Sequence, residues 1–230
     1  MTRQSTIERS ARLTGKGPAM IGRFQVDGSP FDFTVAEEDL DRDATFWQRV
    51  LAGYGVGIGS RIVVVGSVPE SPWLEPPRMA VAALGGSYSN VDAWSWDARR
   101  LEMYCRRLPV SVVLGIGGET VQALAAITDV RERLGSVPVL LARADGLEAL
   151  RREGVDHAGL LVSIGQATAV TMADGSGIAY DESEWLIEAV DGELVVTARG
   201  PRHSVPKRQR SGVAGSVFAT DAGARLVLGS

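Results

Sequence analysis

Short runs of β-branched residues alternate with helix-forming segments through the middle of this 230-residue chain. The runs lie at residues 62–65, 110–116, 138–143 and 159–165. Segments with a helical spacing of apolar residues lie between them, at residues 78–86, 97–108, 118–135 and 146–154. Short, continuous apolar runs are typical of strands buried on both faces. The alternation therefore predicts an α/β fold, a mostly parallel sheet with flanking helices.

Two further expectations concern the segments around the first strand. Residues 31–56 carry a strong helix signal, with Thr34 or a neighbour as the N-cap and Gly53 and Gly55 at the end. Residues 67–77 contain four prolines and are predicted to form a loop.

The pattern changes after about residue 170. Residues 184–200 form two alternating runs that meet at Asp191-Gly192, a strong signal for a type I′ hairpin. Another short strand pair is expected around residues 221–223. The predicted organisation is an N-terminal arm (1–20), an α/β subdomain (21–175) and a small antiparallel β section or subdomain (176–230).

Composition and charge exclude several classes of protein. Apolar residues make up 45% of the chain and charged residues 23%, which excludes a disordered chain. The formal net charge of −4 gives no general attraction to nucleic acid or to an anionic membrane. The sequence has no run of about 18 apolar residues, and its N-terminus lacks the apolar stretch of a signal peptide. Because Cys105 is the single cysteine, we expect a cytoplasmic protein without an internal disulfide.

Two glycine-rich segments invite comparison with nucleotide-binding loops. Residues 53–61 follow a helix and precede a strand, the reverse of the order in a dinucleotide fingerprint, so we interpret them as a helix end and a loop. Residues 114–121 have the order strand, glycines, helix. The start of this helix is either an anion site or a tight strand-to-helix turn.

The sequence predicts no catalytic nucleophile and no metal site. Cys105 lies in the middle of a predicted helix, which favours a small core residue. His157 and His203 are the only histidines, and neither lies near a nucleophile elbow. Two histidines and one cysteine without close spacing do not match a zinc site.

A basic run and several tryptophans remain as binding candidates. Residues 199–210 contain five Lys or Arg side chains, which suit a phosphate group, nucleic acid or simply a solvated loop. Trp73, Trp94 and Trp96 lie near proline-rich or turn segments. They line an aromatic or acyl pocket or serve as ordinary packing residues.

Five segments, in order and spacing, resemble the adenylate-forming acyl- and aryl-CoA ligases, in particular their phenylacetate–CoA ligase-like branch. The segments are residues 24–30, 55–62, 81–86, 188–197 and 206–215. Gly28 and Pro30 fall on the last glycine and the proline of the family's phosphate loop, Ser-Gly-Thr-Thr-Gly-x-Pro. The resemblance covers residues 20–218 and corresponds to the later part of the family's large N-terminal domain. Those enzymes activate a carboxylate with ATP and transfer it to CoA.

Four departures from the family pattern affect its ATP machinery. Residues 24–27 replace the Ser-Gly-Thr-Thr, and the carboxylate of Asp27 would repel phosphates. Gln166 or Ala169 stands where the family has a magnesium-binding glutamate, and Val213 stands where an aspartate binds the ribose. The sequence ends at residue 230, before the family's mobile C-terminal domain would begin.

These departures imply a non-adenylating pseudoenzyme that uses neither ATP nor magnesium, with CoA as an open alternative. We expect a binding or scaffold role toward a partner protein, a second copy of the chain, or an acyl, aryl or CoA-like ligand. An active AMP-dependent ligase-like or acyl-transfer enzyme, with an altered site or a partner-supplied domain, is the alternative. A purely structural subunit is a third hypothesis. The candidate ligand-binding residues are Gly28, Pro30, Gln166, Arg208 and Arg210.

Overall fold

The structure, a computed structural model, describes residues 17–229. Residues 1–16 of the expected N-terminal arm lie outside the described residues, and the first strand begins at Met20. The strands are β1 (Met20–Val26), β2 (Ser29–Val35), β3 (Arg61–Val65), β4 (Ser87–Val91), β5 (Val112–Ile116), β6 (Val139–Ala142), β7 (Gly159–Ile164), β8 (Ala167–Thr171), β9 (Ile178–Tyr180), β10 (Trp185–Val190), β11 (Glu193–Ala198), β12 (Gln209–Thr220) and β13 (Gly223–Leu228). The helices are α2 (Glu37–Gly53), α3 (Ser71–Ala83), α4 (Ala98–Arg107), α5 (Gly118–Ala125), α6 (Val130–Leu134) and α7 (Ala144–Arg152), with short 3-10 helices η1 (Val68–Glu70) and η2 (Ser95–Asp97).

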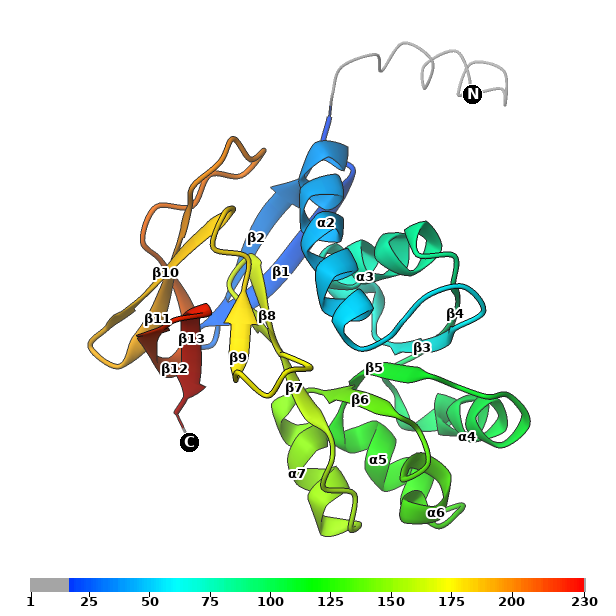
Figure 1. Cartoon of the computed structure of the whole chain (residues 1–230). Coiled ribbons are helices and arrows are strands. Elements are labelled where there is room, and N and C mark those ends of the chain that lie inside the picture. Colours follow the sequence, from blue (N-terminus) through cyan, green and yellow to red (C-terminus); the bar gives the residue numbers. More distant parts are fainter. Residues whose placement is uncertain (1–16, 230) are drawn as a thin grey trace, which may run out of the picture.

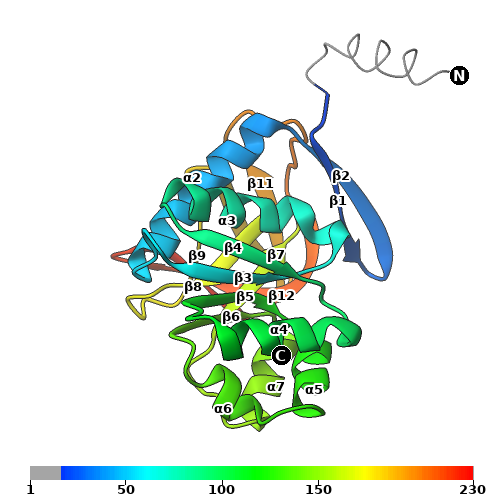
Figure 2. The same cartoon turned by 90° about the vertical axis from the view of Figure 1, so that its right-hand side faces the viewer.

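Five strands in the order β7-β6-β5-β3-β4 form the parallel half of an 11-stranded sheet. Helices α2 and α3 cover one face and α4 to α7 the other (Figure 1, Figure 2). Along β3, Ile62 and Val64 belong to the core under α2 and α3, whereas Val63 and Val65 belong to the opposite core. Each such buried side chain contributes about 1.5–3 kcal/mol. The predicted α/β fold with a mostly parallel sheet is confirmed.

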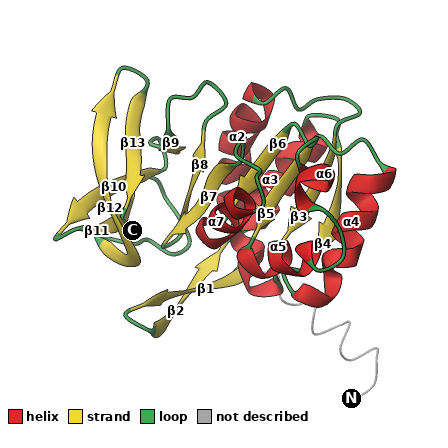
Figure 3. Ribbon diagram, turned by 90° about the horizontal axis from the view of Figure 1, so that it is seen from below, coloured by secondary structure: helices red, strands yellow, loops and turns green. Residues whose placement is uncertain are grey.

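The antiparallel section continues the same sheet. Strand β8 pairs antiparallel with β7, and the order continues through β9, β13, β12 and β11 to β10. Figure 3 shows this strand-only section on one side and the helix-covered half on the other. The predicted hairpin is confirmed between β10 and β11, with Asp191 and Gly192 in the left-handed region (φ 51° and 83°). The strand pair around residues 221–223 is β12 and β13. The division into domains at residue 175 stays a prediction.

The hairpin β1–β2 is a separate two-stranded sheet. Its turn is Asp27-Gly28, with φ of 49° and 74°. Phe24 and Phe33 of the hairpin belong to a small apolar cluster with Trp73 of α3. Strand β1 also approaches β12, and this contact requires Gly212, because a Cβ there would lie 2.5 Å from the carbonyl oxygen of Gln25. The hairpin is thus fastened to the body at two places.

Two local predictions were wrong. Residues 31–35 belong to β2, and the helix begins only at Glu37, where the Asp39 carboxylate accepts from the backbone N–H of Ala36 at 3.0 Å. Residues 68–83 are η1 followed by α3, not a loop up to residue 77. Pro72 lies in the first turn of α3, where a missing N–H costs nothing. The two prolines inside the helix are buried, and the burial offsets their lost hydrogen bonds.

Candidate functional site

The chain order of the parallel strands reverses between β3 and β5. Strand β4 lies on one side of β3, and β5, β6 and β7 follow on the other. Because these strands are parallel, their carboxyl ends meet at one edge of the sheet. In open α/β sheets, ligands bind at this edge where the order reverses. Charged and aromatic residues follow four of the strands there: Glu70 after β3, Trp94 after β4, Glu119 after β5, and Arg143 and Asp145 after β6.

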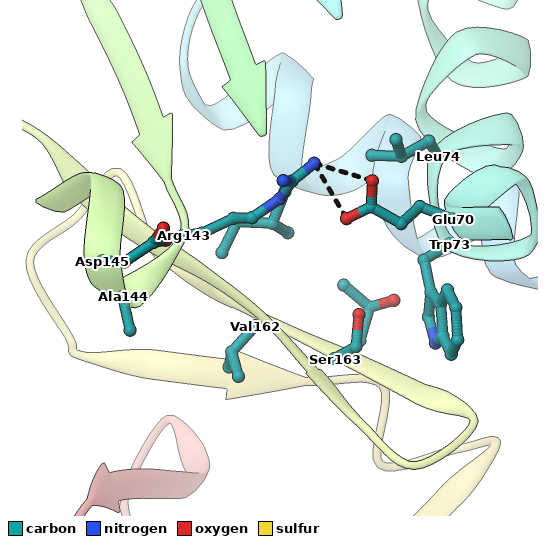
Figure 4. A pocket seen from close by; sticks show the side chains of 10 residues that line it. Glu70, Trp73, Leu74, Arg143, Ala144, Asp145, Val162 and Ser163 are labelled. Carbon is teal, nitrogen blue, oxygen red and sulfur yellow. Dashed lines mark hydrogen bonds and ion pairs between the residues drawn. The ribbon is translucent and has the colours of Figure 1, made fainter. Parts of the chain in front are cut away.

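A cavity of about 400 Å³, here called the apolar cavity, opens at this edge (Figure 4). Its volume lies in the range of small-molecule sites. Apolar side chains from α3, α7 and the β7–β8 hairpin form much of its wall, and the Glu70 and Arg143 side chains meet at one side. The lining residues are Glu70, Trp73, Leu74, Arg143, Ala144, Asp145, Leu161, Val162, Ser163 and Thr168.

A second cavity of about 220 Å³, here called the acidic cavity, adjoins the first. Glu70, Arg143 and Asp145 line both cavities and therefore form a shared wall. The remaining lining residues are Ser67, Ala93, Trp94, Gly117 and Glu119.

The shared wall contains an ion pair between Glu70 and Arg143. The guanidinium Nη2 lies 2.8 Å from Oε1 and 2.9 Å from Oε2 of Glu70. Oε2 also accepts from the backbone N–H of Ser67 at 2.7 Å, and Arg143 donates to the Val65 carbonyl at 3.4 Å. The Arg143 and Glu70 side chains are 28% and 30% exposed, so solvent weakens their attraction. The hydrogen bonds of Glu70 and Arg143 therefore hold the wall in place more than their charge attraction does.

The start of helix α5 is occupied by a carboxylate of the protein itself. Asp145 Oδ2 accepts from the backbone N–H of Gly118 at 2.9 Å, and Oδ1 accepts from that of Gly146, also at 2.9 Å. A Cβ on Gly118 would lie 3.0 Å from Asp145 Oδ2, so the glycine allows this close approach. A helix N-terminus attracts anions through its free N–H groups and its dipole. Of the two interpretations of residues 114–121, the tight strand-to-helix turn is confirmed, because β5 ends at Ile116 and α5 begins at Gly118; Asp145 occupies the start of the helix.

Gly28 and Pro30, both predicted ligand-binding residues, lie in the β1–β2 hairpin and line neither cavity. Beside them, Asp27 Oδ2 lies 2.5 Å from Nη1 of Arg210. Arg210 also pairs with Glu193 at 2.6 Å. The structure therefore brings the hairpin turn and Arg210 together, with two carboxylates already bound to the guanidinium.

Gln166 and Arg208 lie in the antiparallel section. Gln166 follows β7 in the turn to β8 and donates from Nε2 to Oε1 of Gln209 at 3.3 Å. Arg208 has a positive φ of 47°, and its Nε lies 4.0 Å from the carboxylate of Glu188. Val213 packs against the core of the antiparallel section. None of these residues lines the two cavities, and their binding role stays a prediction.

Arg202, in the middle of the basic run, is buried. Its guanidinium pairs with Asp43, lies 3.1 Å from Glu184, and stands 3.9 Å from the ring centroid of Trp185. Burial raises the pKa of the Asp43 carboxyl, and the neighbouring Arg202 only partly opposes this. The run therefore directs Arg202 into the protein as a structural contact.

The tryptophans differ in their surroundings. Trp73 is buried, lines the apolar cavity and donates from Nε1 to the carbonyl of Gly165 at 3.2 Å. Its ring meets that of Phe33 edge-on at 5.2 Å. Trp94 is 52% exposed and lines the acidic cavity, and Trp96 is 63% exposed. The expected aromatic pocket lining thus applies to Trp73 and Trp94.

The cysteine and the histidines have structural contacts. Cys105 packs against the core under α4, and burial raises the pKa of its thiol to about 11. His157 Nε2 lies 2.9 Å from the carbonyl oxygen of Val137, and the backbone N–H of His203 donates to Asp39 at 3.1 Å. Across residues 17–229, no group of three or more His, Cys, Asp or Glu is placed to hold a metal ion. The same residues contain no helix long and apolar enough to cross a membrane.

Sequence reasoning missed the charged residues of the shared wall. Glu70, Arg143 and Asp145 have no motif around them, yet each lies within a few residues of a predicted buried strand. The rule that ligands gather at the carboxyl ends of parallel strands was the available signal. It would have selected these three residues before Gly28 or Arg210.

Comparison with solved structures agrees with this fold, whereas no family profile and no curated protein matches the chain. A 2-hydroxyisobutyryl-CoA ligase in the postadenylation state is 13% identical, with a TM-score of 0.71 over 98% of this chain and 56% of that one. An anthranilate CoA ligase in complex with anthranoyl-AMP is 13% identical, with a TM-score of 0.63 over 90% of this chain and 46% of that one. An o-succinylbenzoate CoA synthetase from Bacillus subtilis is 12% identical, with a TM-score of 0.59 over 94% of this chain and 49% of that one.

The structure is that of an α/β protein with two adjoining cavities at the carboxyl ends of its parallel strands. More particularly, its fold is that of part of the acyl- and aryl-CoA ligases, and the expected fold resemblance to adenylate-forming enzymes is confirmed. The chain spans about half the length of the ligases that it matches.

Proposed function

We propose that this protein is a non-adenylating relative of the acyl-CoA ligases that binds an acyl or aryl group in the apolar cavity. The observation that carries the non-adenylating half of the proposal is the hydrogen bond between Asp145 and Gly118. A nucleotide phosphate at the start of α5 would have to displace a carboxylate that is already in place. Two like charges 4 Å apart repel by about 4 kcal/mol at a surface-like dielectric constant of about 20.

The hairpin turn supports the same proposal. The resemblance assigns residues 24–28 to the loop that surrounds the ATP phosphates. Here the turn carries Asp27, whose carboxylate pairs with Arg210. Arg210 also binds Glu193, so the local charge is one cation against two carboxylates. Such a turn does not favour a triphosphate.

The carboxylates of Glu70 and Asp145 at the sheet edge already have protein partners, which supports the absence of a magnesium–ATP site there. Glu70 already bonds with Ser67 and Arg143, and Asp145 with two backbone N–H groups. Mg²⁺ is usually held by one or two free carboxylates together with substrate phosphates. The bonds already made at this edge support a protein that works without ATP and magnesium. Four expectations stay predictions from the sequence: binding to a partner protein, association with a second copy of the chain, binding of a CoA-like ligand, and a cytoplasmic location.

The binding half of the proposal rests on the apolar cavity. Trp73, Leu74 and Leu161 line it, and an aryl or short acyl group bound there would remove its own apolar surface and the remaining exposed surface of the wall from water. About 25 cal/mol is gained for each Å² of apolar surface removed from water. The walls belong to helices and strands, which keeps the site formed without a ligand.

The test measures adenylation and binding separately on the full chain. Incubation with ATP, magnesium and a panel of acyl and aryl carboxylates should release no pyrophosphate above background. Thermal unfolding should be insensitive to ATP, and aryl or acyl amides should raise the midpoint. Carboxylate-dependent pyrophosphate release that disappears in Arg143→Ala would overturn the proposal in favour of an active ligase.

A cavity-filling variant locates the binding. Ser163→Trp places an indole in the wall of the apolar cavity from an exposed strand position. Ser216→Trp, at an exposed position of β12, is the matched control. Ligand-induced stabilisation should be lost in the first variant and kept in the second. Equal stabilisation of both variants would place the ligand elsewhere and contradict this half of the proposal.

A further inference from the structure

The acidic cavity has an excess of negative charge. Three carboxylates line it, those of Glu70, Glu119 and Asp145, against the single guanidinium of Arg143. Arg143 directs its Nη2 to Glu70, whereas Glu119 and Asp145 accept hydrogen bonds from backbone N–H groups. The net charge of this cavity would therefore repel an anionic ligand group and attract a cationic one.

The carboxylates retain hydrogen-bonding capacity for a ligand. An ionised carboxylate offers about four acceptor positions. Glu119 uses Oε1 for the backbone N–H of Ser95 at 2.8 Å, and Asp145 uses one oxygen each for Gly118 and Gly146. An ammonium group has three donors and no acceptor, so it complements a wall of this kind.

Trp94 adds a feature that acidic side chains alone do not provide. Its indole is half exposed and belongs to the lining of the acidic cavity. A cation within about 6 Å of an indole face gains about 0.5–1 kcal/mol at an exposed site. An aromatic ring among carboxylates therefore favours an organic ammonium group.

The two cavities share the wall made by Glu70, Arg143 and Asp145. The surface of the apolar cavity is mostly apolar, whereas four of the eight residues that line the acidic cavity are charged. A ligand that uses both must have an apolar part and a charged end a few bonds apart. The Glu70–Arg143 pair is partly exposed, so solvent weakens it and such a ligand can lie across it.

We propose that this site takes amines: the apolar part of the ligand lies in the apolar cavity, and its ammonium group lies in the acidic cavity among Glu70, Glu119 and Asp145. This inference rests on the proposed binding function and names the class of ligand. The proposed site should bind arylalkyl or alkyl amines more tightly than carboxylates or phosphates.

The test uses three compounds with one carbon skeleton: 2-phenylethylamine, 2-phenylacetamide and phenylacetate. Calorimetric titration of the full chain at pH 7 compares an ammonium, a neutral amide and a carboxylate. The amine should bind at least about tenfold more tightly than the amide, and phenylacetate should bind most weakly. The affinity of the amine should fall as salt rises, while that of the amide stays constant.

Charge-removing variants assign the effect to the acidic cavity. Glu119→Gln keeps an acceptor oxygen for the Ser95 N–H and removes the charge. It should weaken amine binding about fivefold or more and leave the amide unchanged. Glu132→Gln on α6, a side chain 73% exposed and outside both cavities, is the matched control and should change neither.

Two results would overturn the inference. The first is that phenylacetate binds as tightly as the amine. The second is that the affinity for the amine is unchanged in both Glu119→Gln and Glu70→Gln. Either result leaves the proposed non-adenylating function intact, because that function is tested by pyrophosphate release and by the Ser163→Trp variant. Carboxylate-dependent adenylation together with tight amine binding would overturn the proposed function and keep the ligand class.

Discussion

Asp145, at the start of α7, accepts a hydrogen bond at 2.9 Å from the backbone N–H of Gly118, at the start of α5. The bond ties two helices that follow neighbouring parallel strands, β5 and β6. It also places a fixed negative charge where a helix dipole and a free N–H would otherwise attract an anion from solution. The fold keeps the geometry of an anion site and supplies the anion from its own sequence.

Removal of this carboxylate should open the start of α5 to anions. Asp145→Ala leaves the Gly118 N–H unpaired and should cost about 1–3 kcal/mol in the free energy of unfolding, measured by urea denaturation. In exchange, phosphate or AMP should raise the melting midpoint of the variant and leave that of the wild-type protein unchanged.

Asp129→Ala is the matched control for this experiment. Asp129 caps the short helix α6 by accepting from the N–H of Glu132 at 2.9 Å, far from the carboxyl ends of the strands. Its loss should destabilise the protein by about 1 kcal/mol without creating a response to phosphate. A phosphate response of the same size in both variants would contradict a specific site at α5.

The contact between the β1–β2 hairpin and β12 depends on Gly212. This residue has a φ of 74°, and a Cβ would lie 2.5 Å from the carbonyl oxygen of Gln25. Gly192 also has a positive φ, 83°, but its added Cβ would meet no atom within 4 Å. Alanine at either position costs about 1–2 kcal/mol for the left-handed conformation. Only Gly212→Ala should additionally displace the hairpin.

We therefore expect Gly212→Ala to lose at least about 1 kcal/mol more than Gly192→Ala. For a chain of this size that difference corresponds to about 2–4 °C in Tm. Amide hydrogen exchange in β1 should accelerate in Gly212→Ala alone. Equal losses and unchanged exchange would show that the hairpin does not depend on this close approach.

The sequence predicted the elements whose side chains face a core on both sides. Residues 62–65 and 112–116 are continuous apolar runs because helices cover both faces of β3 and β5. The β10–β11 hairpin was predicted because Asp191-Gly192 needs two positive φ angles, which few other residue pairs adopt easily. In these elements, local chemistry and tertiary packing favour the same structure.

Elements determined by tertiary contacts were not predicted. The prolines of residues 67–77 indicated a loop, yet packing of Trp73 and Leu74 keeps the segment helical. Residues 31–35 have helix-compatible spacing but pair with β1. Strands β8 and β9 are five and three residues long and exist because β7 and β13 lie beside them. The charged cavity wall is assembled from η1 and the start of α7, which lie far apart in the sequence, and no local pattern records such an assembly.

Asp43 should make stability depend on pH in the acid range. Burial raises the pKa of its carboxyl above the value of about 3.9 expected in the unfolded chain. The native state therefore holds the proton longer than the unfolded state does. The contribution of Asp43 to stability is complete below about pH 4 and falls as pH rises through its native pKa.

Asp43→Asn removes this titration and keeps a side chain of similar size. The free energy of unfolding of the wild-type protein should fall relative to that of the variant as pH rises above about 4. Asp41→Asn, two residues earlier at an exposed position of α2, is the control and should follow the wild-type curve. Urea denaturation at several pH values measures all three proteins. A constant difference between Asp43→Asn and wild type would contradict the raised pKa.

Cys105 should react slowly with thiol reagents in the native protein. Burial raises its pKa from 9.0 to about 11, so the reactive thiolate at pH 8 is about a hundredfold scarcer than for a thiol of unshifted pKa. Reaction with iodoacetamide at pH 8 should therefore be slow in the folded protein and rapid in 6–8 M urea, concentrations chosen to unfold most domains of this kind. Glu102→Gln tests whether burial, rather than the nearby Glu102 carboxylate, raises the pKa of Cys105. Because burial is the main cause, the alkylation of this variant should remain slow. Rapid alkylation of the folded chain would mean that Cys105 is accessible and ionised, and the exclusion of a cysteine nucleophile would then have to be withdrawn.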